Sequence, residues 1–224
     1  MSSRFQQFED DLKSRYSCRA YTDQLVSVSD IEDIVRAAGR APSWCNAQPW
    51  QVVVVRSEVG KELSEKMVQA AAEENYSTDF VWPKKYTREF GNRRRECGYQ
   101  LYDAVGVARE DYDGRTEQML RNYTYFDAPQ MAIITTEEEL GLYGATDCGG
   151  FITLFQMAAQ AKGIGSIAQG SIAAFAEIIR DHLNLPANRK ILCGISFGYE
   201  LEDQPVNSFR TTRADVEDVL TVCG

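Results

Sequence analysis

The segment Ala41–Trp50 constrains the fold most, because it connects two stretches of opposite character. Helical spacing of apolar residues leads into it, and an apolar run at residues 51–55 follows it. Pro42 and Pro49 fix φ at their own positions and restrict the residue before each. The segment also carries three hydrogen-bonding side chains and two indoles: Ser43, Asn46, Gln48, Trp44 and Trp50. We interpret it as a rigid loop that holds polar groups against a flat ligand, with a tightly packed corner as the alternative.

Four helices are expected from apolar spacing and from capping residues. The second has a capping box, with Ser29 at the N-cap and Glu32 three positions later. A further helix is expected to start at Ser171, which would cap it. The four main helical ranges are 4–14, 30–38, 58–74 and 147–162.

Strands are expected where apolar and β-branched residues cluster between turn signals. The run 51–55 has no polar alternation, so it is expected to be a central strand buried on both faces. Further strands are expected at 131–136, 164–169 and 190–199. Residues 75–96 are aromatic, charged and irregular, and 97–122 suggest one or two helices interrupted near 111–114. We therefore expect a single domain, residues 1–224, with a lid-like insertion at about 75–125.

Composition excludes several classes of protein. The formal net charge of −9 gives no broad basic surface, so nucleic acid is not an expected partner. The six cysteines form no CxxC pair, so neither a metal site nor a disulfide framework is expected. No apolar signal core or membrane span is recognisable, so we expect a cytoplasmic protein with no membrane partner. The one histidine, His182, stands near the end of a helical segment, where a surface or capping role is favoured over catalysis.

Arginines near both ends of this acidic chain are the other notable feature. In an extended segment Arg15, Ser17 and Arg19 point the same way, and two guanidiniums with a hydroxyl suit a phosphate. An exposed basic turn that pairs with nearby acids is the alternative. Arg210 and Arg213 stand in the tail. Because no Rossmann or P-loop motif is present, these arginines favour another kind of phosphate-bearing cofactor.

Taken together, these segments resemble the FMN-dependent nitroreductase family. The resemblance rests on Arg15-Tyr16-Ser17-Cys18-Arg19, on the loop 41–50 and on Phe126-Asp127-Ala128-Pro129. It continues through Gly163–Gln169 and Asn207–Arg213, in the order that the family has. It implies an α+β fold with a mainly antiparallel central sheet wrapped by helices. It also implies an intertwined homodimer with FMN sites at the interface and the C-terminal arm reaching onto the partner.

The same resemblance implies which residues hold the cofactor. Arg15, Tyr16, Ser17 and Arg19 would bind the FMN phosphate and ribityl chain, with Arg213 and Arg210 adding to the phosphate cluster. Pro42, Ser43 and Trp44 would lie along the flavin ring, and Asn46 and Gln48 would support the loop or bond the ring's polar edge. The turn Ala168-Gln169-Gly170 would offer backbone N–H groups to the other side of the flavin. Some relatives have Pro and an acidic residue in that turn, whereas this chain has Ala168-Gln169-Gly170-Ser171.

The implied activity is transfer of electrons from NADPH or NADH through FMN to a nitroaromatic, quinone or similar small-molecule acceptor, in a ping-pong cycle. No side chain needs to act as a general base, and we expect no catalytic side chain and no metal. Reductive dehalogenation, enone reduction and a non-catalytic flavin-binding module are the alternatives.

Overall fold

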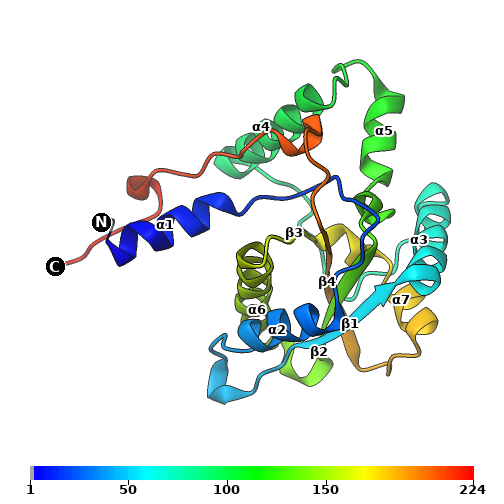
Figure 1. Cartoon of the computed structure of the whole chain (residues 1–224), viewed down its shortest axis with the longest axis horizontal. Coiled ribbons are helices and arrows are strands. Elements are labelled where there is room, and N and C mark those ends of the chain that lie inside the picture. Colours follow the sequence, from blue (N-terminus) through cyan, green and yellow to red (C-terminus); the bar gives the residue numbers. More distant parts are fainter. Residues whose placement is uncertain (1–2) are drawn as a thin grey trace.

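The computed structural model describes residues 3–224, and a four-stranded antiparallel sheet forms its centre. The strands run in the order β1-β2-β4-β3. They are β1 (Gln51–Arg56), β2 (Gln130–Glu137), β3 (Gly165–Gln169) and β4 (Arg189–Gly198). Helices cover both faces of this sheet (Figure 1). The expected α+β fold, a mainly antiparallel sheet wrapped by helices, is therefore confirmed.

Two apolar clusters, one on each face of the sheet, form the core. Successive residues of a strand point to opposite faces, so Met131 and Ile133 belong to one cluster and Ala132 and Ile134 to the other. The first face is covered by α3 (Ser57–Ala72) and α7 (Ala176–Leu183). The second is covered by α2 (Val28–Ala38) and α6 (Gly141–Ala161). Burial on both faces explains why β2 has almost no exposed residue.

Several expected elements are confirmed by the structure. α1 spans Arg4–Ser14, α3 buries the expected apolar residues Leu63 and Met67, and β2 and β4 match their expected ranges. The apolar face of α1 is present but uncovered in this chain, because Phe5 is 68% and Phe8 is 55% exposed. α1 therefore presents apolar surface that no part of residues 3–224 buries.

The expectation that 51–55 forms a central strand is wrong. β1 lies at an edge of the sheet and pairs with β2 alone. Most of its residues are half-buried, and Val55 is the one that is fully buried. An apolar run fits any strand with one well-packed face, so it does not distinguish an edge from a centre.

Three helix starts also differ from the expectation. The N-cap of α2 is Ser27, not Ser29: its hydroxyl accepts from the Asp30 N–H at 3.0 Å and donates to the Asp30 carboxylate. Ser29 and Ser27 each have an acid three residues later, so the pattern fits both starts. α6 begins at Gly141, earlier than the expected Asp147. Ser171 caps no α-helix, because it lies within a 3-10 turn at Gly170–Ala174 that precedes α7.

The insertion is more helical than its composition suggests. α4 (Arg88–Ala104) begins within the stretch 75–96 that was expected to be irregular, and its second half lies where a helix was expected. α5 (Tyr112–Leu120) begins where a break was expected. Asp111 is the N-cap of α5, and its carboxylate accepts from the Gly114 N–H. Figure 1 shows both helices projecting from the sheet at the top of the view. Gly91 is the one buried residue of α4 and α5 has none, so these two helices contribute little to the core.

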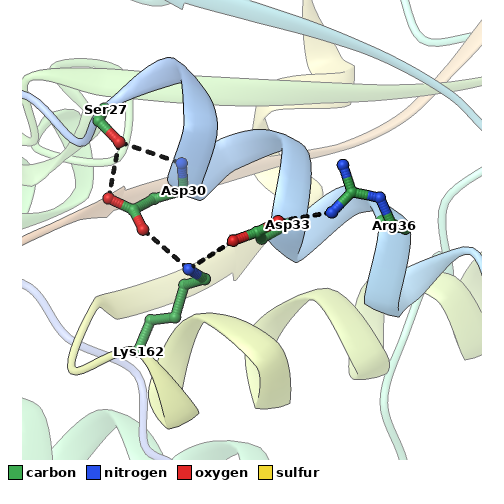
Figure 2. A network of polar contacts seen from close by, with 5 residues as sticks. All are labelled: Ser27, Asp30, Asp33, Arg36 and Lys162. Atoms are coloured by element: carbon green, nitrogen blue, oxygen red, sulfur yellow. Dashed lines mark hydrogen bonds and ion pairs between the residues drawn. The ribbon is translucent and has the colours of Figure 1, made fainter.

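A lysine joins the two helices that cover the second face. Lys162, which follows the last turn of α6, bonds Asp30 at 2.8 Å and Asp33 at 2.9 Å, both on α2 (Figure 2). Asp30 also accepts from the Ser27 hydroxyl, and Asp33 also accepts from Arg36, so each carboxylate has two partners. Within residues 3–224, no helix has the length and apolar character that crossing a bilayer requires.

Candidate functional site

A cavity of about 760 Å³ opens where α1, α4 and the C-terminal tail meet. The structure brings six of the residues singled out from the sequence to its wall: Arg15, Tyr16, Ser17, Arg19, Arg210 and Arg213. The segment after α1 is extended and runs beside β3, where the Cys18 N–H donates to the Ser166 carbonyl. A Cβ at Gly165 would lie 2.9 Å from Cys18 Sγ, so glycine at that position permits this close approach.

Arg19 is held most firmly of the four arginines. Its guanidinium lies 5.7 Å from the centre of the Phe126 ring and 5.5 Å from that of Phe209. One of its nitrogens donates to the Ser17 carbonyl at 3.1 Å. Burial lowers the pKa of Arg19, because desolvation disfavours the charged form. The charge is therefore placed at a fixed point with little water around it.

Asn207 positions this group, and the sequence analysis gave it no role. Its side-chain carbonyl accepts from the Arg19 N–H at 2.7 Å, and its amide donates to the Ala20 carbonyl at 3.2 Å. Asn207 is 5% exposed and its backbone carbonyl accepts from Arg210. One residue thus joins the tail to the segment after α1. The one sequence feature that pointed to Asn207 was its position at the start of Asn207–Arg213, a segment that carries the family resemblance.

The cations of this cavity have no acidic partner within residues 3–224. The ion pairs of that part of the chain use other residues, and none includes Arg15, Arg19, Arg210 or Arg213. Arg210 lies 3.6 Å from the centre of the Tyr16 ring, and Arg213 donates to carbonyls of its own segment. Burial and the nearby Arg213 lower the pKa of Arg15. Glu9 also lines the cavity, but it forms no ion pair with these arginines. Guanidiniums gathered without an ion-pair partner suit an anion with several oxygens, such as a phosphate.

The loop 41–50 lies apart from this cavity. In Figure 1 it follows α2 at the bottom of the view, whereas α4 lies at the top. Pro42, Asn46 and Gln48 are exposed, and the indole of Trp44 is 55% exposed. The Gln48 N–H donates to Ser43 Oγ at 3.0 Å, so these two side chains help to shape the loop itself. Trp50 belongs to the core instead.

The third expected group lies at the end of β3. Gln169 is 3% exposed and its side chain is already used, since it donates to the Asn122 carbonyl and accepts from the Ser196 hydroxyl. Ala168 is half-buried and Gly170 is exposed, and a Cβ at Gly170 would meet no atom within 4 Å. The turn therefore has only backbone groups to offer a ligand.

His182, Cys148 and Cys193 do not line the cavity. His182 Nδ1 accepts from the Lys66 ammonium at 2.9 Å, and its Nε2–H donates to the Val59 carbonyl at 3.0 Å. These two bonds join α7 to α3. Burial raises the pKa of the Cys148 thiol to about 11 and that of Cys193 to about 12. Residues 3–224 contain no group of three or more His, Cys, Asp or Glu that could hold a metal ion.

A family model described as the nitroreductase family matches residues 12–199. A 4-nitrobenzoate reductase of Nocardioides sp. (strain LMS-CY) is 31% identical over 222 residues, which is 96% of this chain and 89% of that protein. Nitroreductase NfnB of Mycolicibacterium smegmatis is 32% identical over 208 residues, covering 92% of this chain and 88% of the relative.

Solved structures agree with these relatives. The FMN-dependent nitroreductase NfnB from Mycobacterium smegmatis in complex with NADPH superposes with a TM-score of 0.90 at 32% identity, over 99% of this chain and 100% of that one. The FMN- and NADPH-dependent NfnB from Sphigopyxis sp. strain HMH superposes with a TM-score of 0.92 at 28% identity, over 96% and 98% of the two chains.

Proposed function

We propose a function from one premise: the chain belongs to the nitroreductase family, and its relatives include reductases of nitroaromatic compounds. It is an FMN-dependent oxidoreductase that passes electrons from NAD(P)H to a nitroaromatic or similarly electron-poor small molecule. The related structures named above are FMN- and NADPH-dependent enzymes, and they superpose on nearly the full length of this chain.

The observation that carries this proposal is the group of four arginines with no acidic partner in residues 3–224. FMN has one phosphate, and an extended segment that presents Arg15, Ser17 and Arg19 to one cavity fits that phosphate and the ribityl chain. Arg213 and Arg210 add charge from the tail, and Tyr16 packs beneath Arg210. A cavity of about 760 Å³ is within the range that holds cofactor-sized ligands.

We propose that a second copy of the chain completes the site. The loop 41–50 and the arginine cavity lie apart within one chain, yet the resemblance assigns both to the same FMN. A homodimer in which the loop of one protomer meets the flavin ring held by its partner reconciles the two. The exposed apolar residues of α1 and of the tail, such as Phe5 and Val219, supply surface for this contact. Pro42, Ser43, Trp44, Asn46 and Gln48 are the loop residues proposed to lie along the ring.

FMN, when bound, would supply the redox chemistry: two-electron transfer from NAD(P)H to the acceptor in a ping-pong order. The residues of this chain bind the phosphate, orient the ring and exclude competing reactions. Ala168, Gln169 and Gly170 are proposed to offer backbone N–H groups to the ring. We propose no catalytic side chain, and His182 is engaged on the far helices.

We further propose that residues 1–224 act as one domain and that the insertion at about 75–125 serves as a lid. The insertion is fixed at its start, since Asp79 is bonded by Arg180 and by the Ile191 N–H at 2.8 Å. The projecting α4 and α5 beyond it leave room for movement. A cytoplasmic location stays a prediction from the sequence.

The test is to purify the chain with FMN, record its visible spectrum and add NADPH without oxygen. We expect flavin absorbance that NADPH bleaches and that added 4-nitrobenzoate restores. A protein without flavin absorbance after reconstitution contradicts FMN binding. Flavin that is bound but not bleached by NADPH or NADH favours the non-catalytic flavin-binding module instead.

A further inference from the structure

The loop 41–50 is attached to the first turns of α6 by two neighbouring contacts. The Trp44 N–H donates to Asp147 Oδ2 at 3.0 Å. The Trp44 indole meets the Tyr143 ring edge-on, with centroids 4.1 Å apart and an interplanar angle of 83°. Tyr143 and Asp147 are four residues apart on a helix, so they lie on the same face. One face of α6 thus holds both the backbone and the side chain of Trp44.

The loop needs such support because its backbone is strained. Three of its non-glycine residues have left-handed φ values: Cys45 at 52°, Asn46 at 57° and Gln48 at 50°. Strain of this kind persists only where the surroundings fix it, and it gathers at functional sites. Bonds inside the loop, such as Asn46 N–H to the Ser43 carbonyl at 3.0 Å, define its shape but not its place. The bond to Asp147 ties that shape to the rest of the molecule.

The packing beneath the loop is close. A Cβ at Gly144 would lie 2.8 Å from Thr136 Oγ1 and 3.7 Å from Pro49 Cβ, so α6 approaches both β2 and the loop. A cavity of about 300 Å³ remains between the loop and α6, with Trp44, Tyr143, Asp147 and Glu139 in its wall. The indole of Trp44 is nevertheless 55% exposed. More than half of this flat side chain is therefore accessible to a flat partner, although Tyr143 packs against it.

We propose that Asp147 is a positioning residue of the acceptor site: through its bond to the Trp44 N–H, and with Tyr143 behind the indole, it fixes how Trp44 meets a planar aromatic acceptor. This rests on the proposed function, in which the loop faces the flavin ring of the partner protomer. Asp147 itself touches neither cofactor nor acceptor. Its carboxylate selects the orientation of Trp44, and Trp44 contributes stacking area that favours flat aromatic compounds.

The first measurement needs no cofactor. Amide hydrogen exchange of residues 43–48 is compared in the FMN-free wild type, Asp147→Ala and Asp147→Asn. Loss of a charge-assisted bond predicts exchange of the Trp44 amide at least about tenfold faster in Asp147→Ala. Asp147→Asn keeps an acceptor oxygen and should recover most of the protection. Glu139→Ala is the matched control, because Glu139 lines the same cavity and makes no hydrogen bond to the loop within residues 3–224.

The second measurement uses the FMN-loaded protein with NADPH and 4-nitrobenzoate. Asp147→Ala should raise KM for the acceptor severalfold while the anaerobic rate of flavin reduction by NADPH stays within about twofold of the wild type. Asp147→Asn should restore KM, and Glu139→Ala should leave it unchanged. A general loss of structure would instead lower the reduction rate and fail to recover in Asp147→Asn.

Unchanged exchange of the Trp44 amide in Asp147→Ala would overturn the proposal, as would faster exchange without a change in KM. A wild type whose flavin NADPH does not reduce would overturn the proposed function, whereas the exchange measurement, made without FMN, would still show whether Asp147 holds the loop. Thermal unfolding checks that each variant folds. Asp147→Ser replaces the alanine variant should the latter not fold.

Discussion

At the scale of single residues, the arginine cavity shows how charge without a partner can be kept ready for a ligand. Arg19 is half-buried between Phe126 and Phe209, and no ion pair of residues 3–224 includes it. Burying a cation costs free energy unless an anion offsets the loss of hydration. The rest of the fold bears that cost in the free protein, and a bound phosphate would offset it.

Arg19→Ala should therefore weaken FMN binding more than it weakens the fold. Loss of a charge-assisted phosphate contact predicts an affinity loss of about 1.5–3 kcal/mol, which is roughly a 10- to 150-fold rise in Kd. Fluorescence titration of the FMN-free protein measures this, with urea unfolding as the check on stability. Arg36→Ala is the control, since Arg36 lies on α2 and pairs with Asp33. An unchanged Kd in Arg19→Ala would show that the FMN phosphate does not bind in this cavity.

The sequence predicted part of this group and could not predict the rest. Arg15, Ser17 and Arg19 were expected to point the same way, because alternation along an extended segment is local and follows from strand geometry. Asn207 was not predicted to position them, because its bond to the Arg19 N–H joins residues 188 positions apart. Contacts of that separation depend on the whole fold, and no local pattern encodes them.

At the scale of elements, the sequence predicts whether a segment forms a helix or a strand better than it predicts which elements pack beside it. The apolar run of β1 gave the strand, but its edge position depends on where β2 and β4 pair. Two serines fitted the start of α2, and the structure selects Ser27, whose hydroxyl exchanges two hydrogen bonds with Asp30. The first half of α4, residues 88–96, was expected to be irregular because its charged, aromatic sequence has no apolar stripe, and only Gly91 is buried.

Lys162→Met should loosen the packing of α2 on α6. Lys162 bonds two carboxylates on α2, and these bonds lower the pKa of Asp30 and Asp33 below the ordinary 3.8 (Figure 2). A carboxylate with a lowered pKa stabilises the fold above its unfolded pKa, and this is lost as the pH falls through the folded value. The wild type should thus have the higher urea midpoint at pH 7, and the difference should shrink as the pH falls below 3.8 and vanish once both carboxylates are protonated.

The same difference should shrink in 1 M salt, because the pairs are partly exposed and ions screen them. Lys61→Met is the matched control, since Lys61 lies 4.0 Å from Glu58 in a more exposed pair. A Lys162→Met variant whose midpoint matches the wild type at every pH would show that the lysine contributes nothing to the joint.

At the scale of the whole molecule, a single chain leaves apolar surface uncovered and keeps the two proposed parts of the FMN site apart. α1 exposes its apolar face, and the tail carries further apolar residues, among them Val219 at 71% and Val222 at 82% exposure. The loop 41–50 and the arginine cavity lie apart. The proposed homodimer would bury such surface and join the two halves of the site.

The double variant Phe5→Ser/Phe8→Ser should shift the protein from dimer to monomer. Both side chains are more than half exposed in the single chain, and serine removes the apolar area that a partner would bury. Sedimentation equilibrium measures the change, and FMN affinity should fall with it, because the partner's loop is lost. Val59→Ser removes a half-exposed apolar side chain on α3 and should leave the dimer intact. A wild type that sediments as a monomer would contradict the homodimer itself.

The edge position of β1 has a consequence for the newly made chain. Val52, Val53, Val54 and Val55 form a short, uncharged, β-prone stretch on a strand that pairs on one side only. Such an edge is a template for unwanted strand pairing between chains. If the free edge of β1 stays uncovered during folding, the newly made chain is open to aggregation. Yield on overexpression should therefore be limited by how quickly this edge is shielded rather than by how stable the finished fold is.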